Sequence, residues 1–118
     1  METLTIILNT APYGDEKVWN ALRLSKAVVS VAVKMTVNIF LLGDAVTAAK
    51  KGQKPPEGYY NVQEMLKELV DFGVKVIACR TCINARGLAE GDLIEGVKMG
   101  TMMDLAHWIE AGQKVLSF

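Results

Sequence analysis

The chain has 118 residues, 51% of them hydrophobic, and its 13 basic and 13 acidic side chains give a formal net charge of zero. This length suits one domain, residues 1–118, and leaves no room for a second. Because the charges balance and form no block of one sign, the composition argues against nucleic acid and membrane surfaces as partners.

In chain order, the apolar periodicity predicts strands alternating with helices. The predicted elements are a strand at Leu4–Leu8, a helix from Glu16 to about Val33, a strand at Thr36–Leu42, a short helix at Ala45–Lys51, a helix opened by Asn61 and ended by Gly73, strands at Val74–Ala78 and Val97–Met99, a helix from Thr101 to Gly112, and a strand at Lys114–Phe118. This alternation indicates an α/β fold, a three-layer α/β/α sandwich around a mainly parallel sheet of about five strands. The strand order does not follow from the pattern.

Polar residues mark where the predicted helices begin. Asp15 is placed to cap the first helix, and Asn61 with Glu64 and Thr101 with Asp104 have the spacing of capping boxes. The sequence therefore predicts well-defined starts for these three helices.

The second half of the first helix, KAVVSVAVKM, is apolar on nearly every side. We expect such a helix to be covered by the sheet and also by a neighbouring subunit. The loop Gln53–Tyr60 contains two prolines and two tyrosines, and its aromatic side chains favour an ordered structural loop over a mobile lid. Trp19 is expected to pack on a helix face.

Ligand sites in parallel sheets form beyond the carboxyl ends of the strands. Four segments follow predicted strands in this chain: Asn9–Asp15, Gly43-Asp44, Cys79–Arg86 and Gly100–Met103. We expect them to meet at one edge of the sheet. Within them, Tyr13 is expected to line this rim, and Met102 to form core or pocket wall.

Cys79 and Cys82 are the only cysteines of the chain, and they lie where a predicted strand turns into a helix. Backbone N–H groups at a helix start stabilise a thiolate, the reactive form of cysteine, and Arg80 or Arg86 would add positive charge. The C-x-x-C spacing brings the two sulfurs about one helical turn apart. The alternative is packing, since cysteine is among the most buried residue types.

A zinc site would need ligands beyond the cysteines, and His107 is the sole further soft candidate, so we expect no metal. The amino-terminal segment has neither a basic leader nor an apolar run of signal-peptide length, and no stretch approaches the roughly 20 apolar residues of a membrane helix. We therefore expect a cytoplasmic protein with reduced cysteines.

The chain resembles the DsrE/DsrF-like proteins, which include the TusD-type sulfur-relay subunits, over nearly its whole length. The resemblance rests on APYGDEKVWNALRLS after the first strand, GDAV after the second, the segment CRTCINARG, and the closing MDLAHWIEAGQKVLSF.

This resemblance implies an α/β/α domain that forms homo- or hetero-oligomers, such as a trimer or a hexamer, and carries sulfur as a cysteine persulfide. In the sulfur-relay members an Arg-Gly pair stands at the seventh and eighth positions after the working cysteine. That pattern assigns the role to Cys79, followed by Arg86 and Gly87. Cys82 lies outside the single-cysteine pattern, which leaves a resolving role open.

The sequence thus favours a sulfur carrier or sulfurtransferase that passes sulfur from Cys79 to a partner thiol without a cofactor. Its partners would be a sulfur-donor or sulfur-acceptor protein. The alternatives are a non-catalytic oligomeric module that binds a ligand or partner, and a thiol–disulfide redox protein. The candidate catalytic residues are Cys79 and Cys82, and the supporting residues are Tyr13, Arg80, Asn84, Arg86, Gly87 and Met102.

Overall fold

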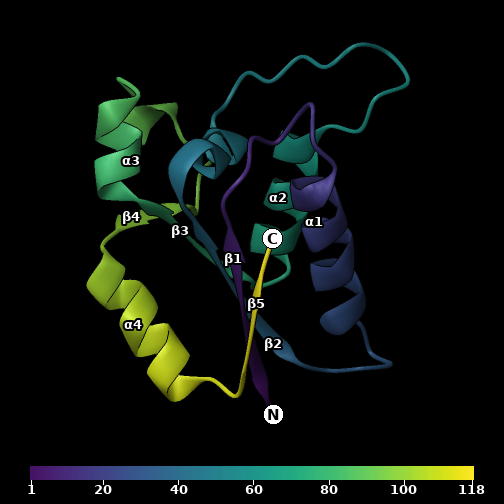
Figure 1. The fold of residues 1–118 in the computed structure, drawn as a ribbon. Helices are drawn as coiled ribbons and strands as arrows, with labels where there is room; N and C mark the ends of the chain where they lie inside the picture. The colour runs from purple at the N-terminus through teal and green to yellow at the C-terminus, as the bar shows by residue number, and fades with distance from the viewer.

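A five-stranded parallel sheet in the order β4-β3-β2-β1-β5 organises the computed structural model, which describes residues 1–118 (Figure 1). The strands are β1 (Thr3–Leu8), β2 (Thr36–Leu41), β3 (Lys75–Cys79), β4 (Lys98–Gly100) and β5 (Lys114–Ser117). The helices are α1 (Lys17–Val28), α2 (Val62–Asp71), α3 (Arg80–Ala85) and α4 (Met102–Ala111), with 3₁₀ turns η1 (Gly43–Ala49) and η2 (Glu90–Asp92). All the predicted strands are present, which confirms the predicted α/β class.

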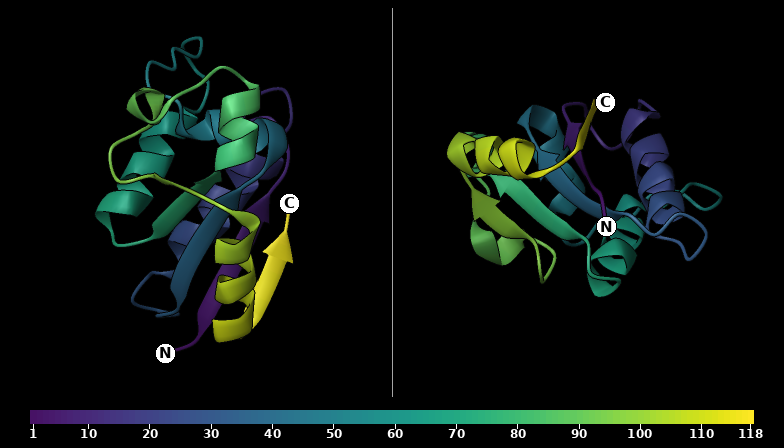
Figure 2. Two further views of the ribbon diagram at one scale, coloured as in Figure 1. Left: turned by 90° about the vertical axis from the view of Figure 1, so that its left-hand side faces the viewer. Right: turned by 90° about the horizontal axis from the view of Figure 1, so that it is seen from below.

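The helices form two outer layers around this sheet. Helices α1 and α2 pack side by side on one face, whereas α4 covers the other, as the view from below in Figure 2 shows. Helix α3 and η1 lie at the carboxyl ends of the strands (Figure 1). The predicted three-layer sandwich is therefore confirmed. None of the helices combines the length and the apolar character needed to span a membrane.

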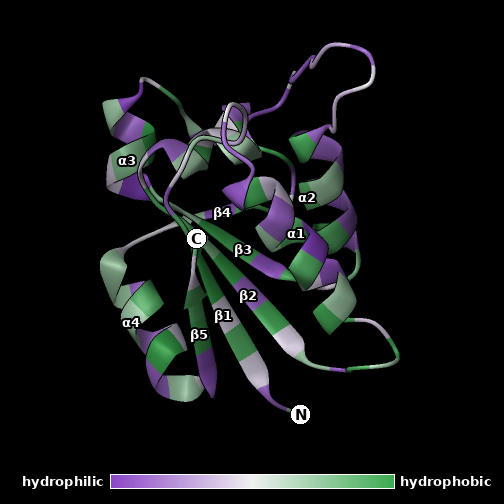
Figure 3. Ribbon diagram, turned by 45° about the vertical axis from the view of Figure 1, so that its right-hand side comes forward, coloured by the Kyte–Doolittle hydropathy of each residue, from purple (hydrophilic) through white to green (hydrophobic).

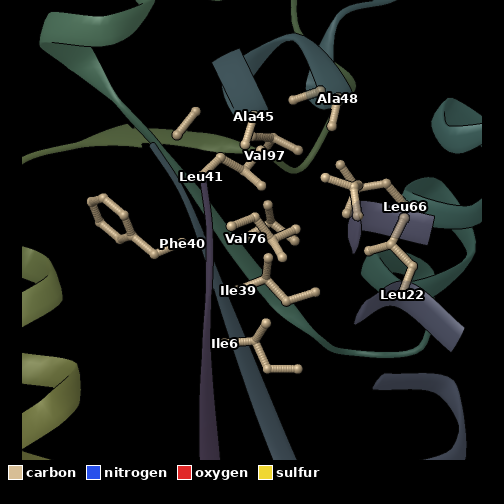
Figure 4. Packing of buried hydrophobic residues seen from close by; sticks show 14 of the residues in the cluster. Ile6, Leu22, Ile39, Phe40, Leu41, Ala45, Ala48, Leu66, Val76 and Val97 are labelled. Atoms are coloured by element: carbon tan, nitrogen blue, oxygen red, sulfur yellow. The ribbon is translucent and has the colours of Figure 1, made fainter. Parts of the chain in front are cut away.

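Alternation along the central strands divides the core between the two faces. In Figure 4, Ile6 and Ile39 point toward Leu22 of α1 and Leu66 of α2, and all four side chains are fully buried. Phe40 points to the opposite side. There its ring meets Trp108 of α4 edge-on, with ring centroids 6.0 Å apart. This single aromatic contact anchors α4 to the sheet.

Hydrogen bonds confirm the predicted starts of α2 and α4, whereas α1 begins at Lys17, one residue later than predicted, with Glu16 in place of Asp15 as the N-cap residue. Asp15 Oδ1 still accepts from the Lys17 N–H at 2.8 Å. Asn61 Oδ1 accepts from the Glu64 N–H at 3.1 Å. At α4, the Thr101 N–H donates to the Asp104 carboxylate at 2.8 Å.

The predicted end of the first helix is wrong. Helix α1 ends at Val28, and residues 29–33 form a turn in which Val31 is 84% exposed. The run of β-branched residues weakens helix propensity, and the Ser30 hydroxyl donates to the Ala27 carbonyl at 2.7 Å. Lys34 then adopts a left-handed conformation (φ 58°) that turns the chain toward β2. The segment that we expected a neighbouring subunit to cover is therefore an exposed turn and not a helix.

The loop 53–60 is anchored at both ends, as predicted for an ordered structural loop. The side-chain nitrogen Nε2 of Gln53 donates to the carbonyls of Ala48 and Lys50, each at 2.9 Å. Tyr60 stacks on Trp19 with centroids 5.0 Å apart, so Trp19 packs on a helix face as expected. In Figure 3 this connection is mainly hydrophilic, whereas the strands are mainly hydrophobic.

Candidate functional site

The segments after four neighbouring strands meet at the carboxyl edge of the sheet. Gly100 ends β4 opposite Cys79 of β3. The Gly43 N–H, just after β2, donates to Cys82 Sγ at 3.2 Å. A Cβ on Gly43 would stand 3.5 Å from the carbonyl oxygen of Asn9, which follows β1. The predicted convergence therefore exists, because β1 to β4 are neighbours in the sheet.

Cys79 is the last residue of β3 and the residue that caps α3. Its side chain is 7% exposed. Burial raises the pKa of this thiol most strongly, the backbone N–H groups of Cys82 and Thr81 oppose the rise, and the Cys82 side chain adds to it. The net effect is a raised pKa. The expected N–H groups are present, but desolvation outweighs them, so the isolated chain favours the thiol over the thiolate.

Cys82 lies one helical turn beyond Cys79, on α3, and both cysteines are free thiols. Its side chain is half-buried and receives the Gly43 N–H from another part of the chain. The Cys82 side chain also contributes to the raised pKa of the Cys79 thiol. The two sulfur-bearing side chains are therefore neighbours at this edge.

The positive charge predicted beside the cysteines is engaged elsewhere. Arg86 donates from Nε and Nη2 to Asp44 Oδ1 at 3.1 and 2.8 Å, and from Nη1 to the Cys82 carbonyl at 3.1 Å. Arg80 is exposed and makes no hydrogen bond or ion pair. Arg86 thus positions the turn that carries Cys82, and its charge is compensated by Asp44.

Gly87 ends α3 in a left-handed conformation (φ 69°) that glycine adopts without steric cost. Its N–H donates to the Asn84 carbonyl at 3.1 Å, and the Leu88 N–H donates to the Ile83 carbonyl at 3.2 Å. This pair of bonds is the Schellman motif. The Arg-Gly pair therefore closes the helix that begins at Cys79.

The other predicted supporting residues lie at varied positions. Asn84 is exposed on α3. The prediction that Met102 forms core or pocket wall is wrong, because Met102 is 58% exposed at the first position of α4. The Tyr13 hydroxyl donates to Gln53 Oε1 at 2.7 Å and accepts from the Val62 N–H at 3.0 Å. Tyr13 therefore joins the first rim loop to the start of α2.

The sequence reasoning did not include Asp44 or Gln53 among the site residues. The position of Asp44 after a strand was a signal, but its pairing with a residue 42 positions later is visible only in the fold. No group of three His, Cys, Asp or Glu side chains is arranged to hold a metal ion. His107 lies exposed on α4 near Glu110, 3.7 Å away.

A parallel α/β/α sandwich with a cysteine where β3 becomes α3 defines the class of this protein. The profile of the DsrE/DsrF-like family matches residues 2–118, and the chain belongs to that family. It is 44% identical over 118 residues to Protein YchN of Escherichia coli, with both chains fully covered. It is 43% identical over 114 residues to the uncharacterized protein MJ0989 of Methanocaldococcus jannaschii, with 97% of each chain covered.

Solved structures share the fold. The crystal structure of ychN protein from E. coli superposes with a TM-score of 0.91 over the full length of both chains, at 44% identity. The protein of unknown function MTH1491 from Methanobacterium thermoautotrophicum has a TM-score of 0.82 at 15% identity, again with both chains fully covered. The second likeness supports the fold alone.

Proposed function

We propose that this protein is a cytoplasmic sulfur carrier of the sulfurtransferase type, which holds sulfur as a persulfide on Cys79 and passes it to a partner thiol. The observation that carries the proposal is the position of Cys79, at the junction of β3 and α3 on the shared carboxyl edge. Membership of the DsrE/DsrF-like family supports it. The reaction requires no cofactor.

The transfer takes place in two balanced steps. Cys79 attacks the outer sulfur of a donor persulfide, the donor S–S bond breaks, and the donor leaves as a thiol that takes up the Cys79 proton. An acceptor thiolate then attacks the outer sulfur on Cys79 and releases the Cys79 thiolate. Neither step changes the total number of persulfide bonds.

The raised pKa and the burial of Cys79 support activation on contact with a partner. A donor or acceptor protein that docks over the carboxyl edge would bring hydrogen-bond donors or positive charge to the sulfur, as low-pKa cysteines require.

We further propose that the protein forms a homo-oligomer, a trimer or a hexamer, which its exposed apolar side chains support. They are Val31, Val33, Phe72, Met102, Met103 and Ile109.

The direct test is made in a Cys82→Ser background, which leaves Cys79 as the one thiol. The protein is treated with a low-molecular-weight persulfide, and the intact mass is measured. We expect the gain of one sulfur atom, which an acceptor thiol removes. The matched control is Cys79→Ser,Cys82→Ser, which should gain none. An equal gain in the control, or no gain in Cys82→Ser, would exclude a persulfide on Cys79.

A second candidate is a non-catalytic oligomeric module in which the cysteines only pack, and the 7% exposure of Cys79 favours it. It predicts that an alkylating reagent modifies both thiols slowly in the folded protein and that the protein takes up no sulfur. The sulfur carrier predicts that, after persulfide loading, the reagent alkylates the outer sulfur, so that Cys79 carries one extra sulfur atom together with the alkyl group.

A further inference from the structure

We propose that Cys82 is a resolving thiol, which attacks the Cys79 persulfide, forms a Cys79–Cys82 disulfide and releases hydrosulfide. The inference rests on the proposed persulfide on Cys79. It adds a second activity to the same site: when no acceptor takes the sulfur, the protein discharges it reductively.

Cys82 is held at its side chain by a separate part of the chain and at its backbone by Arg86, which ends the same helix. The Gly43 N–H donates to Cys82 Sγ at 3.2 Å. Arg86 Nη1 donates to the Cys82 carbonyl at 3.1 Å, and the same guanidinium binds Asp44 through two nitrogens. Gly43 and Asp44 open η1 after β2, so η1 holds this turn of α3 from outside. The sulfur of Cys82 therefore has a defined position at the rim.

That position is next to Cys79. Cys79 caps α3 and Cys82 is its third residue, so one turn separates them, and residues at this spacing share a helix face. The Cys82 backbone N–H and side chain both influence the pKa of the Cys79 thiol, as expected for groups one turn apart. Both are free thiols. A bridge between them requires movement of side chains within one turn, and no rearrangement of the sheet.

Burial distinguishes the two cysteines. Cys79 is buried, whereas Cys82 is half-buried nearer the rim. The inner sulfur of a Cys79 persulfide occupies the place of the present Cys79 sulfur, so it stays beside Cys82. The outer sulfur is added beyond it. The one-turn spacing of Cys79 and Cys82 therefore favours attack of Cys82 on the inner sulfur.

The step balances without an external oxidant. The Cys82 thiolate forms a bond to the inner sulfur, the bond between inner and outer sulfur breaks, and the outer sulfur leaves with its electron pair as hydrosulfide. The proton of the Cys82 thiol goes to this leaving group. The Cys82 sulfur is oxidised from the thiol to the disulfide level, the outer sulfur is reduced to hydrosulfide, and the Cys79 sulfur keeps its oxidation level. Return to the dithiol form requires two equivalents of an external thiol, such as glutathione.

The experiment compares wild type with Cys82→Ser, both reduced, freed of reductant, and treated with glutathione persulfide in the absence of an acceptor. Serine retains an acceptor for the Gly43 N–H, so the control preserves the hydrogen bond seen here. Thermal unfolding checks that both proteins fold. Intact mass and released hydrosulfide are followed over time.

For wild type we expect release of one hydrosulfide per chain and a protein lighter by two hydrogen atoms, with Cys79 and Cys82 joined in a peptide digest. Cys82→Ser should keep the added sulfur and release none beyond the reagent blank. Wild type that keeps its sulfur as long as Cys82→Ser, or sulfur found on Cys82 without a bridge, overturns the inference but leaves the carrier proposal intact. Absence of sulfur on Cys82→Ser excludes the carrier proposal itself.

Discussion

Arg86 binds one carboxylate oxygen of Asp44 through two nitrogens, Nε at 3.1 Å and Nη2 at 2.8 Å, across 42 positions of sequence. The contact joins α3 to η1, and the third nitrogen of Arg86 donates to the Cys82 carbonyl. The arginine that follows the strand-end cysteine therefore acts in this chain on the position of the second cysteine, and its charge is compensated by Asp44.

Replacement of Arg86 by alanine should loosen the turn that carries Cys82. The pair is partly exposed, so we expect the free energy of unfolding to fall by less than about 1 kcal/mol. The alkylation rate of Cys82, measured in a Cys79→Ser background by mass spectrometry, should nevertheless rise clearly, because the Cys82 carbonyl loses its Arg86 donor and α3 loses its link to Asp44 of η1.

The matched control for this change is Lys26→Ala, which removes the exposed ion pair between Lys26 and Glu68 at 2.9 Å. This pair links α1 to α2, away from the cysteines. It should change stability by a similar small amount and leave Cys82 alkylation unchanged. Equal effects of the two variants on Cys82 would contradict a local role for Arg86.

Gly100 lies at a close approach between β4, β3 and α4. A Cβ there would stand 2.6 Å from Ile77 Cγ2 and 2.7 Å from Asp104 Oδ2. Gly100→Ala should therefore destabilise the fold by about 1–3 kcal/mol, as overpacking does. Urea unfolding measures the change. Gly91→Ala, where nothing lies within 4 Å, should stay within about 0.5 kcal/mol of wild type.

The raised pKa of Cys79 predicts an alkaline shift in its reactivity. In Cys82→Ser, burial remains as the main cause, so the rate of alkylation by iodoacetamide should reach half its maximum at a higher pH than in the same protein unfolded in urea. The pKa of Cys79 is higher in the folded than in the unfolded protein, so by linkage the protonated thiol contributes to stability at pH values below its pKa in the unfolded protein. This contribution is lost as the pH rises through the folded pKa. Coincident profiles for folded and unfolded protein would contradict the shift.

Gln53 holds the loop before α2 with both ends of its amide. Its nitrogen donates to the carbonyls of Ala48 and Lys50, and its oxygen accepts from the Tyr13 hydroxyl. Gln53→Glu turns an acceptor toward those carbonyls and should cost about 1–3 kcal/mol in the free energy of unfolding. Denaturant titration measures the loss. The converse change Glu57→Gln, at an exposed position in the same loop, should remain within about 0.5 kcal/mol of wild type.

The strands and most helix boundaries could be predicted because their signals are local. Apolar runs mark β1 and β2, and side chains such as Asn61 satisfy the N–H groups of the turn that follows them. The end of α1 was not predictable from periodicity, since a run of valines has the same apolar pattern in a helix and in an exposed turn. The turn forms here because the chain has to reach β2.

The features of the candidate site also separate into those with a local sequence signal and those that depend on the tertiary structure. The sequence by itself determined that Cys79 stands at the end of a strand, that Cys82 follows one turn later, and that Arg86 and Gly87 occupy the seventh and eighth positions after Cys79, since all three depend on spacing along one short segment. Only the tertiary structure decided what surrounds them. Burial raises the Cys79 pKa against the helix N–H groups, while Gly43 and Asp44 hold Cys82 and Arg86. The physical reason is that desolvation and hydrogen bonds across the sheet edge depend on which strands are neighbours, and the order β4-β3-β2-β1-β5 arises only when the whole chain folds.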